Sequence, residues 1–490
     1  MRVARAPAFL VVALAAGSSA AGTIQVTASA VDSALERFPA SPNGRFMAVR
    51  TTADLTPGAP GNADGSAETW RAHLFTGALV QATAANLDAT CVRVTIDGDL
   101  VFASREDLTP GAPGNLDGSF ESWLFRGVPG TLVQMTAGPE DSFHQAFRHP
   151  RRTAYLVSKS DLVPGGNADG SNEVYAYDVA TAEIRQVTAS AQSSLLRGLA
   201  GGDIGIVESG GDLDPGNNAD GSAEVFLVNL ATGAARQITA SSGNSRLVGL
   251  DGAGRRVAIE SREDLVPGQN TDGSLEVFAF DRTTGRIGQM TSSLGDTSFA
   301  AFVDRSALMA VHSRQDLATG GNADGSQEVF LVQVVTRAVR QFTSSPDDST
   351  LLEIGDAPLR WAAIERAGEI HVQRVRGVAT QPFRLTDGVS GGSFAGIGFR
   401  GRRAAFDSTG DLVAGGNADG SREAFLAELG TGVPRVRQIT ASATADSAAA
   451  SISGRFPVLV IESRADIVPG GNADGSQEVY LHAFGPLPRR

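Results

Sequence analysis

Short apolar segments alternate with polar, glycine-bearing turns along almost the whole chain. Segments such as 255–261 (RRVAIES) and 173–178 (EVYAYD) carry β-branched and aromatic residues. Runs of this length and composition, bounded by Gly, Asn, Asp and Pro, are typical of β-strands. Beyond the first residues of the chain, no stretch shows sustained helical periodicity. The pattern predicts an all-β protein.

The strands recur in a fixed order around a loop with the motif N-x-D-G-S-x-E. The aspartate of this motif is found at Asp64, Asp117, Asp169, Asp220, Asp272, Asp324, Asp419 and Asp474. The interval is about 52 residues, except for one double interval in which the unit near residues 345–387 lacks the loop. We therefore predict nine units. Each contains an inner strand, a second strand, the loop, an aromatic third strand and a last strand ending in Q-x-T.

Four strands per unit at this period are typical of β-propeller blades. The first Q-x-T segment, at 25–27, precedes every unit, whereas the last aromatic strand, at 478–484, has no Q-x-T strand after it. Pairing the N-terminal strand with the last blade would close a ring and cover an exposed strand edge. We predict a single β-propeller over residues 22–490 with about nine four-stranded blades. Eight blades are the alternative, because four to eight is the usual range.

The repeats resemble the WD40-like repeats of TolB-type β-propellers, the PD40 class. The turn at 41–45 (SPNGR), the loop at 161–171 (DLVPGGNADGS) and the strand at 173–178 (EVYAYD) carry this resemblance. It covers essentially the whole mature chain and implies the fold, whereas propellers host many different activities. We expect the propeller alone, without the additional N-terminal domain of TolB or the hydrolase domain of propeller peptidases.

Residues 1–21 have the features of a secretory signal peptide. Arg2 and Arg5 precede an apolar run at 8–16, and small residues follow at 18–21. The run is too short to span a bilayer as a helix, and no later segment is long and apolar enough. We therefore expect a periplasmic or secreted protein that does not insert into a membrane. The single cysteine, Cys91, allows no internal disulfide.

The formal net charge is −13 at pH 7. An acidic surface argues against nucleic acid or anionic lipid as a partner and is compatible with cations or basic proteins. We expect a monomeric scaffold that binds a protein or a small ligand on a propeller face, with no catalysis assigned. A lyase or lactonase site in the central channel is the enzymatic alternative. No H-E-x-x-H or G-x-S-x-G motif supports it.

The repeated loop offers the oxygen ligands that calcium prefers. In three copies these are Asp264, Asn270, Asp272, Ser274 and Glu276; Asn167, Asp169, Ser171 and Glu173; and Asn322, Asp324, Ser326 and Glu328. The spacing is similar to part of an EF-hand loop, although the bidentate Glu at position 12 is missing. Turn chemistry also explains these residues, because Asn and Asp side chains bond their own backbone. A structural loop and a calcium site are both open hypotheses, and no other cofactor is predicted.

The unit at 357–375 breaks the repeat. A short turn at 366–368 replaces the acidic loop, and Trp361, Glu365, Glu369 and His371 are distinctive to this unit. One hypothesis makes this notch a site for an asymmetric partner. The alternative is a blade that lost its loop and buries Trp361 in the core. Elsewhere, His144 and His149 are predicted to be a surface pair rather than a metal site.

Overall fold

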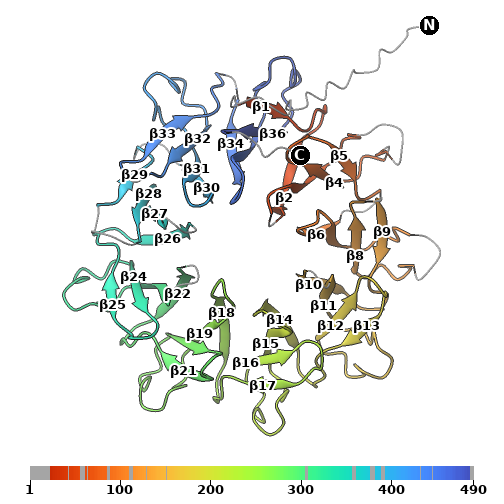
Figure 1. The fold of residues 1–490 in the computed structure, drawn as a ribbon, viewed down its shortest axis with the longest axis vertical. Coiled ribbons are helices and arrows are strands. Elements are labelled where there is room, and N and C mark those ends of the chain that lie inside the picture. The colour runs from red at the N-terminus through yellow and green to blue at the C-terminus, as the bar shows by residue number, and fades with distance from the viewer. Residues whose placement is uncertain are drawn as a thin grey trace.

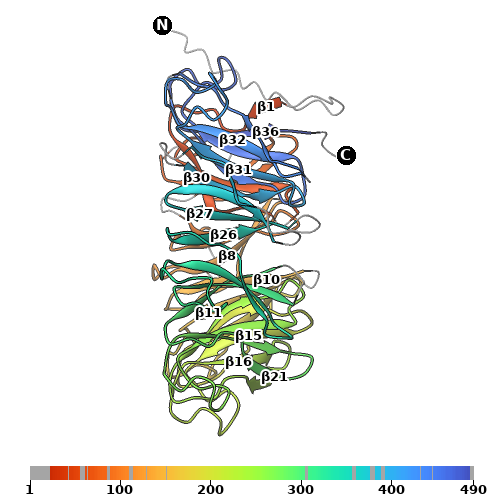
Figure 2. The same ribbon diagram turned by 90° about the vertical axis from the view of Figure 1, so that its left-hand side faces the viewer.

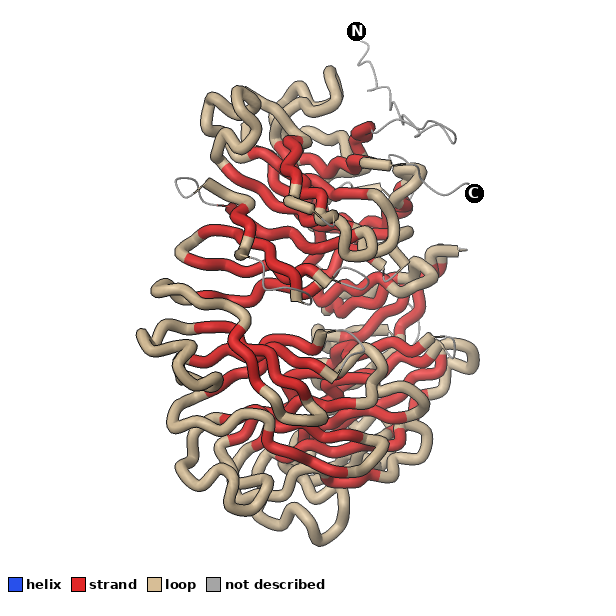
Figure 3. The backbone as a smooth tube through the Cα atoms, turned by 60° about the vertical axis from the view of Figure 1, so that its left-hand side comes forward, coloured by secondary structure: helices blue, strands red, loops and turns tan. Residues whose placement is uncertain are grey.

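The computed structural model describes residues 22–485, apart from 42, 56–60, 63, 85–88, 110–113, 129, 150–151, 304–306, 356–359, 376–380, 388–391, 431 and 444 and the side chains of 37–39 and 91. The expected signal peptide at 1–21 lies outside this part. The described residues form β-strands joined by loops and turns (Figure 3). Within them, no helix is long and apolar enough to cross a membrane. The all-β prediction is confirmed.

The strands form nine four-stranded antiparallel blades arranged around a central axis (Figure 1), and Figure 2 shows the same ring from its side. The inner strands of the first two blades are also joined by one parallel bridge, between Phe38 and Arg93. From the inner to the outer strand, the first three blades consist of β2 (Ser33–Ala40), β3 (Phe46–Thr51), β4 (Glu68–His73) and β5 (Leu79–Gln81); β6 (Thr90–Val94), β7 (Leu100–Ser104), β8 (Glu121–Arg126) and β9 (Thr131–Gln134); and β10 (Ser142–Arg148), β11 (Thr153–Ser158), β12 (Glu173–Asp178) and β13 (Ile184–Gln186). Blades four to six consist of β14 (Ser194–Leu199), β15 (Ile204–Ser209), β16 (Glu224–Asn229) and β17 (Ala235–Gln237); β18 (Ser245–Leu250), β19 (Arg256–Ser261), β20 (Glu276–Asp281) and β21 (Arg286–Gln289); and β22 (Thr297–Phe302), β23 (Leu308–Ser313), β24 (Glu328–Gln333) and β25 (Val339–Gln341). The last three consist of β26 (Ser349–Ile354), β27 (Trp361–Arg366), β28 (Glu369–Arg374) and β29 (Phe383–Arg384); β30 (Gly392–Gly398), β31 (Arg403–Ser408), β32 (Glu423–Glu428) and β33 (Arg435–Gln438); and β34 (Ser447–Ile452), β35 (Val458–Ser463), β36 (Glu478–Ala483) and β1 (Gly22–Gln25).

The ninth blade is completed by the N-terminal strand. β1 pairs antiparallel with β36 and places Ile24 opposite Leu481. The residues after β1 also bond the ninth blade, because the Thr27 hydroxyl and the Ser29 N–H both donate to the Glu478 carboxylate. The predicted closure of the ring, and the count of nine blades, are confirmed.

The hydrophobic core lies between the blades. Among the described residues, buried apolar side chains form nine clusters, one at each interface between neighbouring blades. The second and third strands of a blade face a neighbour on both sides, which explains why β19 is buried at every position. The interface that closes the ring is built in the same way, with Val460 and Leu481 of blade nine packed against Val49 and Trp70 of blade one.

Blade seven lacks the long loop, as predicted. Its strands β27 and β28 are joined by Ala367 and Gly368, with φ angles of 50° and 78°. Two successive residues with positive φ are typical of the tight turn of a two-residue β-hairpin. This blade therefore keeps the four strands and loses only the connection.

Candidate functional site

The long loop joins the second and third strands in the eight blades that carry it. Because the blades share one topology, all eight loops leave the ring on the same face. In the view along the axis they reach the outer rim (Figure 1). This set of loops repeats the same polar motif in eight blades, and we take it as the candidate site.

Side chains of the loop fix its backbone, as the copy in blade five shows. In blade five, Asp264 accepts hydrogen bonds from the backbone N–H groups of Gly268, Gln269 and Asn270 at 2.5, 3.0 and 3.0 Å. These bonds, that of Asn270 first, hold the pKa of the Asp264 carboxyl below its usual value. The buried Asn270 amide then donates to the backbone carbonyls of Arg262 and Ser274, at 3.1 and 3.0 Å, and ties together the two ends of the loop.

The aspartate of the Asp-Gly turn is exposed but bonded. Asp272 Oδ1 accepts from the Ser274 N–H and hydroxyl, at 3.0 and 2.8 Å. These bonds lower the pKa of the Asp272 carboxyl, so it is ionised at neutral pH. The equivalent aspartate accepts from the N–H of the following serine in each of the eight loops. The loops therefore place eight negative charges on one face of the ring.

The glutamate that follows each loop is buried at the start of the third strand. Glu276 accepts hydrogen bonds from the Ser293 N–H at 2.7 Å, from the Ser274 hydroxyl at 3.1 Å and from the Thr291 hydroxyl. Burial raises the pKa of the Glu276 carboxyl, and these bonds oppose the shift. Glu276 thus joins the loop to the Q-x-T segment of its own blade.

The other candidate calcium ligands lie in the same arrangement. Asn167 and Asn322 are buried and donate to backbone carbonyls, Asp169 and Asp324 accept from the following serine, and Glu173 and Glu328 are buried beside Ser171 and Ser326. Among the described residues, no three His, Cys, Asp or Glu side chains are gathered as metal ligands. The hydrogen bonds explain the loop as a self-contained turn, and calcium binding stays a prediction.

The structure separates the four residues of the notch in blade seven. Trp361 is buried against blade eight, with the Arg374 guanidinium 5.2 Å from its ring centroid. The pairing of β27 with β28 places Glu365 on the same face of the blade as Trp361, and His371 on the opposite face. Glu369 is buried and accepts from the Thr386 hydroxyl, as Glu276 does from Thr291. The partner role of these residues stays a prediction.

Hydrogen bonds between blades form a feature that the sequence reasoning missed. The residue before the last residue of the second strand reaches the next blade, where its side chain accepts the N–H at a β-bulge of the inner strand. Such bonds join Glu208 to Leu247, Glu260 to Phe299, His312 to Leu351 and Glu462 to Leu35, at 2.6 to 2.9 Å. The repeated Glu-Ser at 208–209, 260–261 and 462–463 was the available signal.

The prediction that His144 and His149 form a surface pair is wrong. His144 is on β10 with 6% of its surface exposed, and burial lowers its pKa to about 3. His149 lies just after that strand, 3.4 Å from a carboxylate oxygen of Asp97. His144 is buried because it is on an inner strand that packs between blades, and a spacing of five residues does not reveal this placement.

The enzymatic alternative, a lyase or lactonase site in the central channel, has no residues assigned to it. It stays a prediction.

No family model matches the chain, and no curated protein matches it. Among solved structures, TolB from Acinetobacter baumannii is 15% identical, over 61% of this chain and 63% of its own, with a TM-score of 0.30. The β-propeller domain of the trilobed protease from Pyrococcus furiosus is 11% identical, over 73% and 99%, with a TM-score of 0.36. An oligogalacturonate lyase from Vibrio parahaemolyticus is 9% identical, over 81% and 98%, with a TM-score of 0.37. The chain thus spans less than two thirds of TolB. The nine four-stranded blades fit the TolB-like resemblance of the repeats, and these similarities concern fold alone.

Proposed function

We propose that the protein is an exported binding scaffold whose partner docks through a basic surface on the face that carries the loops. The observation that carries this proposal is the repetition of one exposed, ionised aspartate in eight loops of the same face. Clustered charges of one sign attract a partner of the opposite sign and orient it during encounter.

The rigidity of the loops supports the same function. Asp264 and Asn270 hold the two ends of the loop, and Glu276 attaches it to the outer part of the blade. A loop that is ordered before binding loses little conformational entropy when a partner docks. The ring therefore provides a fixed array of charges rather than a flexible surface.

The test replaces the charge and keeps the turn. Asparagine accepts the same hydrogen bonds through its side-chain oxygen, so Asp→Asn at Asp64, Asp117, Asp169, Asp220, Asp272, Asp324, Asp419 and Asp474 should fold as the wild type does. Lysozyme serves as the basic protein probe, and binding is measured by surface plasmon resonance over a series of salt concentrations. We expect the wild type to bind the probe with an affinity that falls as salt rises, and the eightfold variant to bind at least tenfold more weakly.

A second variant controls for net charge. Asp→Asn or Glu→Gln changes at exposed acids at the opposite ends of the strands, such as Asp97, Glu183 and Glu428, remove charge without touching the loop face. If this variant weakens binding as much as the loop variant does, general acidity and not the loop face attracts the probe, and the proposed docking face is wrong.

A further inference from the structure

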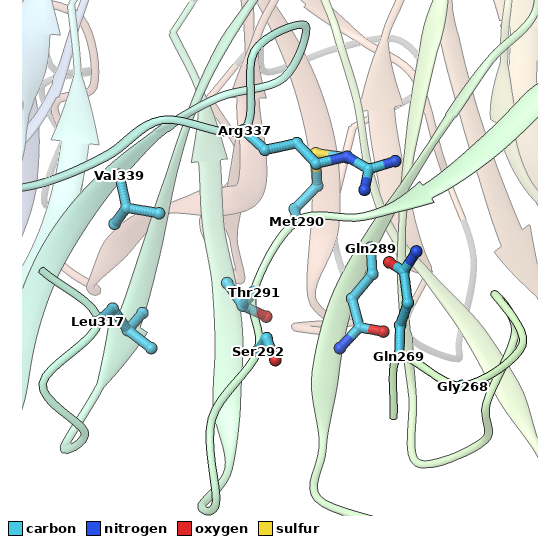
Figure 4. Close-up of a pocket in the computed structure, with 9 residues that line it drawn as sticks. All are labelled: Gly268, Gln269, Gln289, Met290, Thr291, Ser292, Leu317, Arg337 and Val339. Carbon is cyan, nitrogen blue, oxygen red and sulfur yellow. The ribbon is translucent and has the colours of Figure 1, made fainter. Parts of the chain in front are cut away.

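A pocket of about 490 Å³ lies on the outer rim between blades five and six. Gln269 of the blade-five loop and Gln289 and Met290 at the end of β21 line one side. Leu317 and Arg337 of blade six line the other (Figure 4). None of the eight loop aspartates lines it. The pocket thus uses the blade-five loop but none of the aspartates that give the loop face its charge.

The pocket occurs where the repeat changes. In five other blades the glutamine of the Q-x-T segment donates to the carbonyl of the glycine that precedes the loop asparagine. The pairs are Gln25 with Gly471, Gln81 with Gly61, Gln134 with Gly114, Gln186 with Gly166 and Gln438 with Gly416, at 2.9 to 3.2 Å. A Cβ on Gly166 would lie 2.0 Å from Gln186 Oε1, and one on Gly471 2.0 Å from Gln25 Oε1. This arrangement therefore requires glycine at 166 and 471.

Blade five has Gln269 at the position of this glycine. A Cβ at this position would clash with the Q-x-T glutamine in the arrangement of the other blades, so Gln289 is left without its usual partner. Both polar atoms of the Gln289 carboxamide lack a hydrogen bond although only 4% of the residue is exposed. A buried polar group without a partner is costly. A ligand that bonds this carboxamide would recover that cost.

The surrounding groups define the chemistry of such a ligand. Arg337 is in the turn before β25, and Figure 4 shows its side chain extending over Met290 on the side of the two glutamines. Among the ion pairs of the described residues, none includes Arg337. The nearby Asp264 carboxylate is already engaged by three backbone N–H groups. Met290, Leu317 and Val339 add apolar wall.

We propose that this pocket binds the C-terminal end of a peptide whose last residue is apolar. The terminal carboxylate pairs with the Arg337 guanidinium, in the charge-assisted geometry that arginine favours. The last peptide group exchanges hydrogen bonds with the Gln289 carboxamide, which offers both a donor and an acceptor. The apolar side chain packs on Leu317 and Val339. This combination of carboxylate, amide and apolar group distinguishes a peptide end from a simple anion.

The binding test uses two probes that differ only at the terminal group. N-acetyl-Gly-Leu with a free carboxylate is compared with the same peptide as its C-terminal amide, by saturation-transfer NMR and by calorimetric titration. We expect the acid to bind the wild-type protein and the amide to bind at least tenfold more weakly. Equal binding of both, or no signal from the acid at about 10 mM, ten times a millimolar Kd, would overturn the proposal.

Matched variants locate the site. Arg337→Gln should weaken acid binding at least tenfold, whereas Arg286→Gln, which removes the same charge from the exposed first residue of β21, outside the pocket, should leave it unchanged. Gln269→Gly restores the glycine of the other blades, so Gln289 can bond the carbonyl of residue 269 and fill the pocket. It should abolish binding without lowering Tm.

Gln269→Asn provides the complementary control. Blade four carries Asn217 at this position, so asparagine is compatible with the fold. Because the Cβ is retained, Gln289 remains without its usual partner, and binding should persist within threefold of wild type. Loss of binding in Gln269→Asn but not in Gln269→Gly would contradict the role given to Gln289. All these outcomes are independent of the loop aspartates, so they test the pocket and not the docking face.

Discussion

Asn270 holds the two ends of the blade-five loop together through one buried amide. Replacing it by alanine leaves the carbonyls of Arg262 and Ser274 without that donor. We predict that Asn270→Ala lowers the free energy of unfolding by about 1–3 kcal/mol, the usual cost of unsatisfied buried polar groups. The change is measured by urea denaturation. Thr271→Ala, at the exposed neighbouring residue, should change stability by less than about 0.5 kcal/mol. Equal effects would remove the structural role given to Asn270.

Glu276 gives a prediction about pH. Burial raises its pKa above the ordinary 4.5, so the folded protein holds the proton more tightly than the unfolded chain. This contribution to stability is fully present below pH 4.5 and is lost as the pH rises through the folded value. Glu276→Gln removes the dependence. The Tm of the wild type minus that of the variant should therefore fall between pH 4 and pH 7, as followed by circular dichroism.

Asp272 should show the opposite dependence of stability on pH. Hydrogen bonds from Ser274 lower its pKa, so its contribution is present above the ordinary 3.8 and is lost as the pH falls through the folded value. The Tm difference between wild type and Asp272→Asn should rise with pH over the acid range. The same direction of change in both variants would contradict the separation of a buried glutamate from an exposed, bonded aspartate.

At the scale of elements, the contact between Gly166 and Gln186 joins the loop of blade three to its last strand, β13. Gly166→Ala places a Cβ 2.0 Å from Gln186 Oε1 and displaces a hydrogen bond of 3.0 Å. We predict a loss of about 1 kcal/mol, the typical net value of such a bond. In a Gln186→Ala background the same change should cost less, because the clash with Gln186 and the hydrogen bond are both absent and only the contact with the Val163 carbonyl, at 2.9 Å, remains. Additive costs in this double-mutant cycle, measured by denaturation, would show that the two residues do not interact.

The two hypotheses for the loop, a calcium site and a purely structural turn, predict different effects of calcium on Tm. Asp264 and Asp272 already accept backbone N–H groups, and Glu276 accepts hydroxyl and N–H groups. We therefore expect the Tm to change by less than about 1 °C between a chelator and millimolar calcium, because an ion that does not bind the folded state cannot stabilise it. A clear rise of Tm with calcium concentration would instead support an ion in the repeated loops.

The strands and loops could be predicted from the sequence because they repeat. Contacts between different blades could not, because no local pattern specifies them. Repetition fixes the order of strands and loop in each unit, and the isolated segment at 25–27 indicates which blade it must complete. The bond from Glu260 to Phe299 joins two different blades, and no local pattern reveals which buried N–H a side chain will meet. The pocket likewise depends on a single residue, Gln269, which replaces the glycine of the other blades beside Gln289.

At the scale of the whole molecule, the ring is closed by the contacts that are used within the other blades. Ser29 N–H bonds Glu478 as Ser293 N–H bonds Glu276, both at 2.7 Å. Asp32 likewise accepts from the Gln477 N–H, as Asp296 does from Leu275. The N-terminal segment therefore rebuilds a standard blade edge. A closed ring keeps all the loops on one face, and β1 covers the strand edge that β36 would otherwise expose.

Disulfide trapping tests this closure most directly. Thr23 is opposite His482, and their side chains meet at 2.9 Å between Oγ1 and Nδ1. In a Cys91→Ser background, Thr23→Cys with His482→Cys should form a disulfide on mild oxidation, detected by peptide mapping, and should raise the Tm. Thr23→Cys with Leu481→Cys is shifted by one residue, which puts the two side chains on opposite faces, and should stay reduced. Equal cross-linking of both pairs, or of neither, would contradict a ring closed by its first strand.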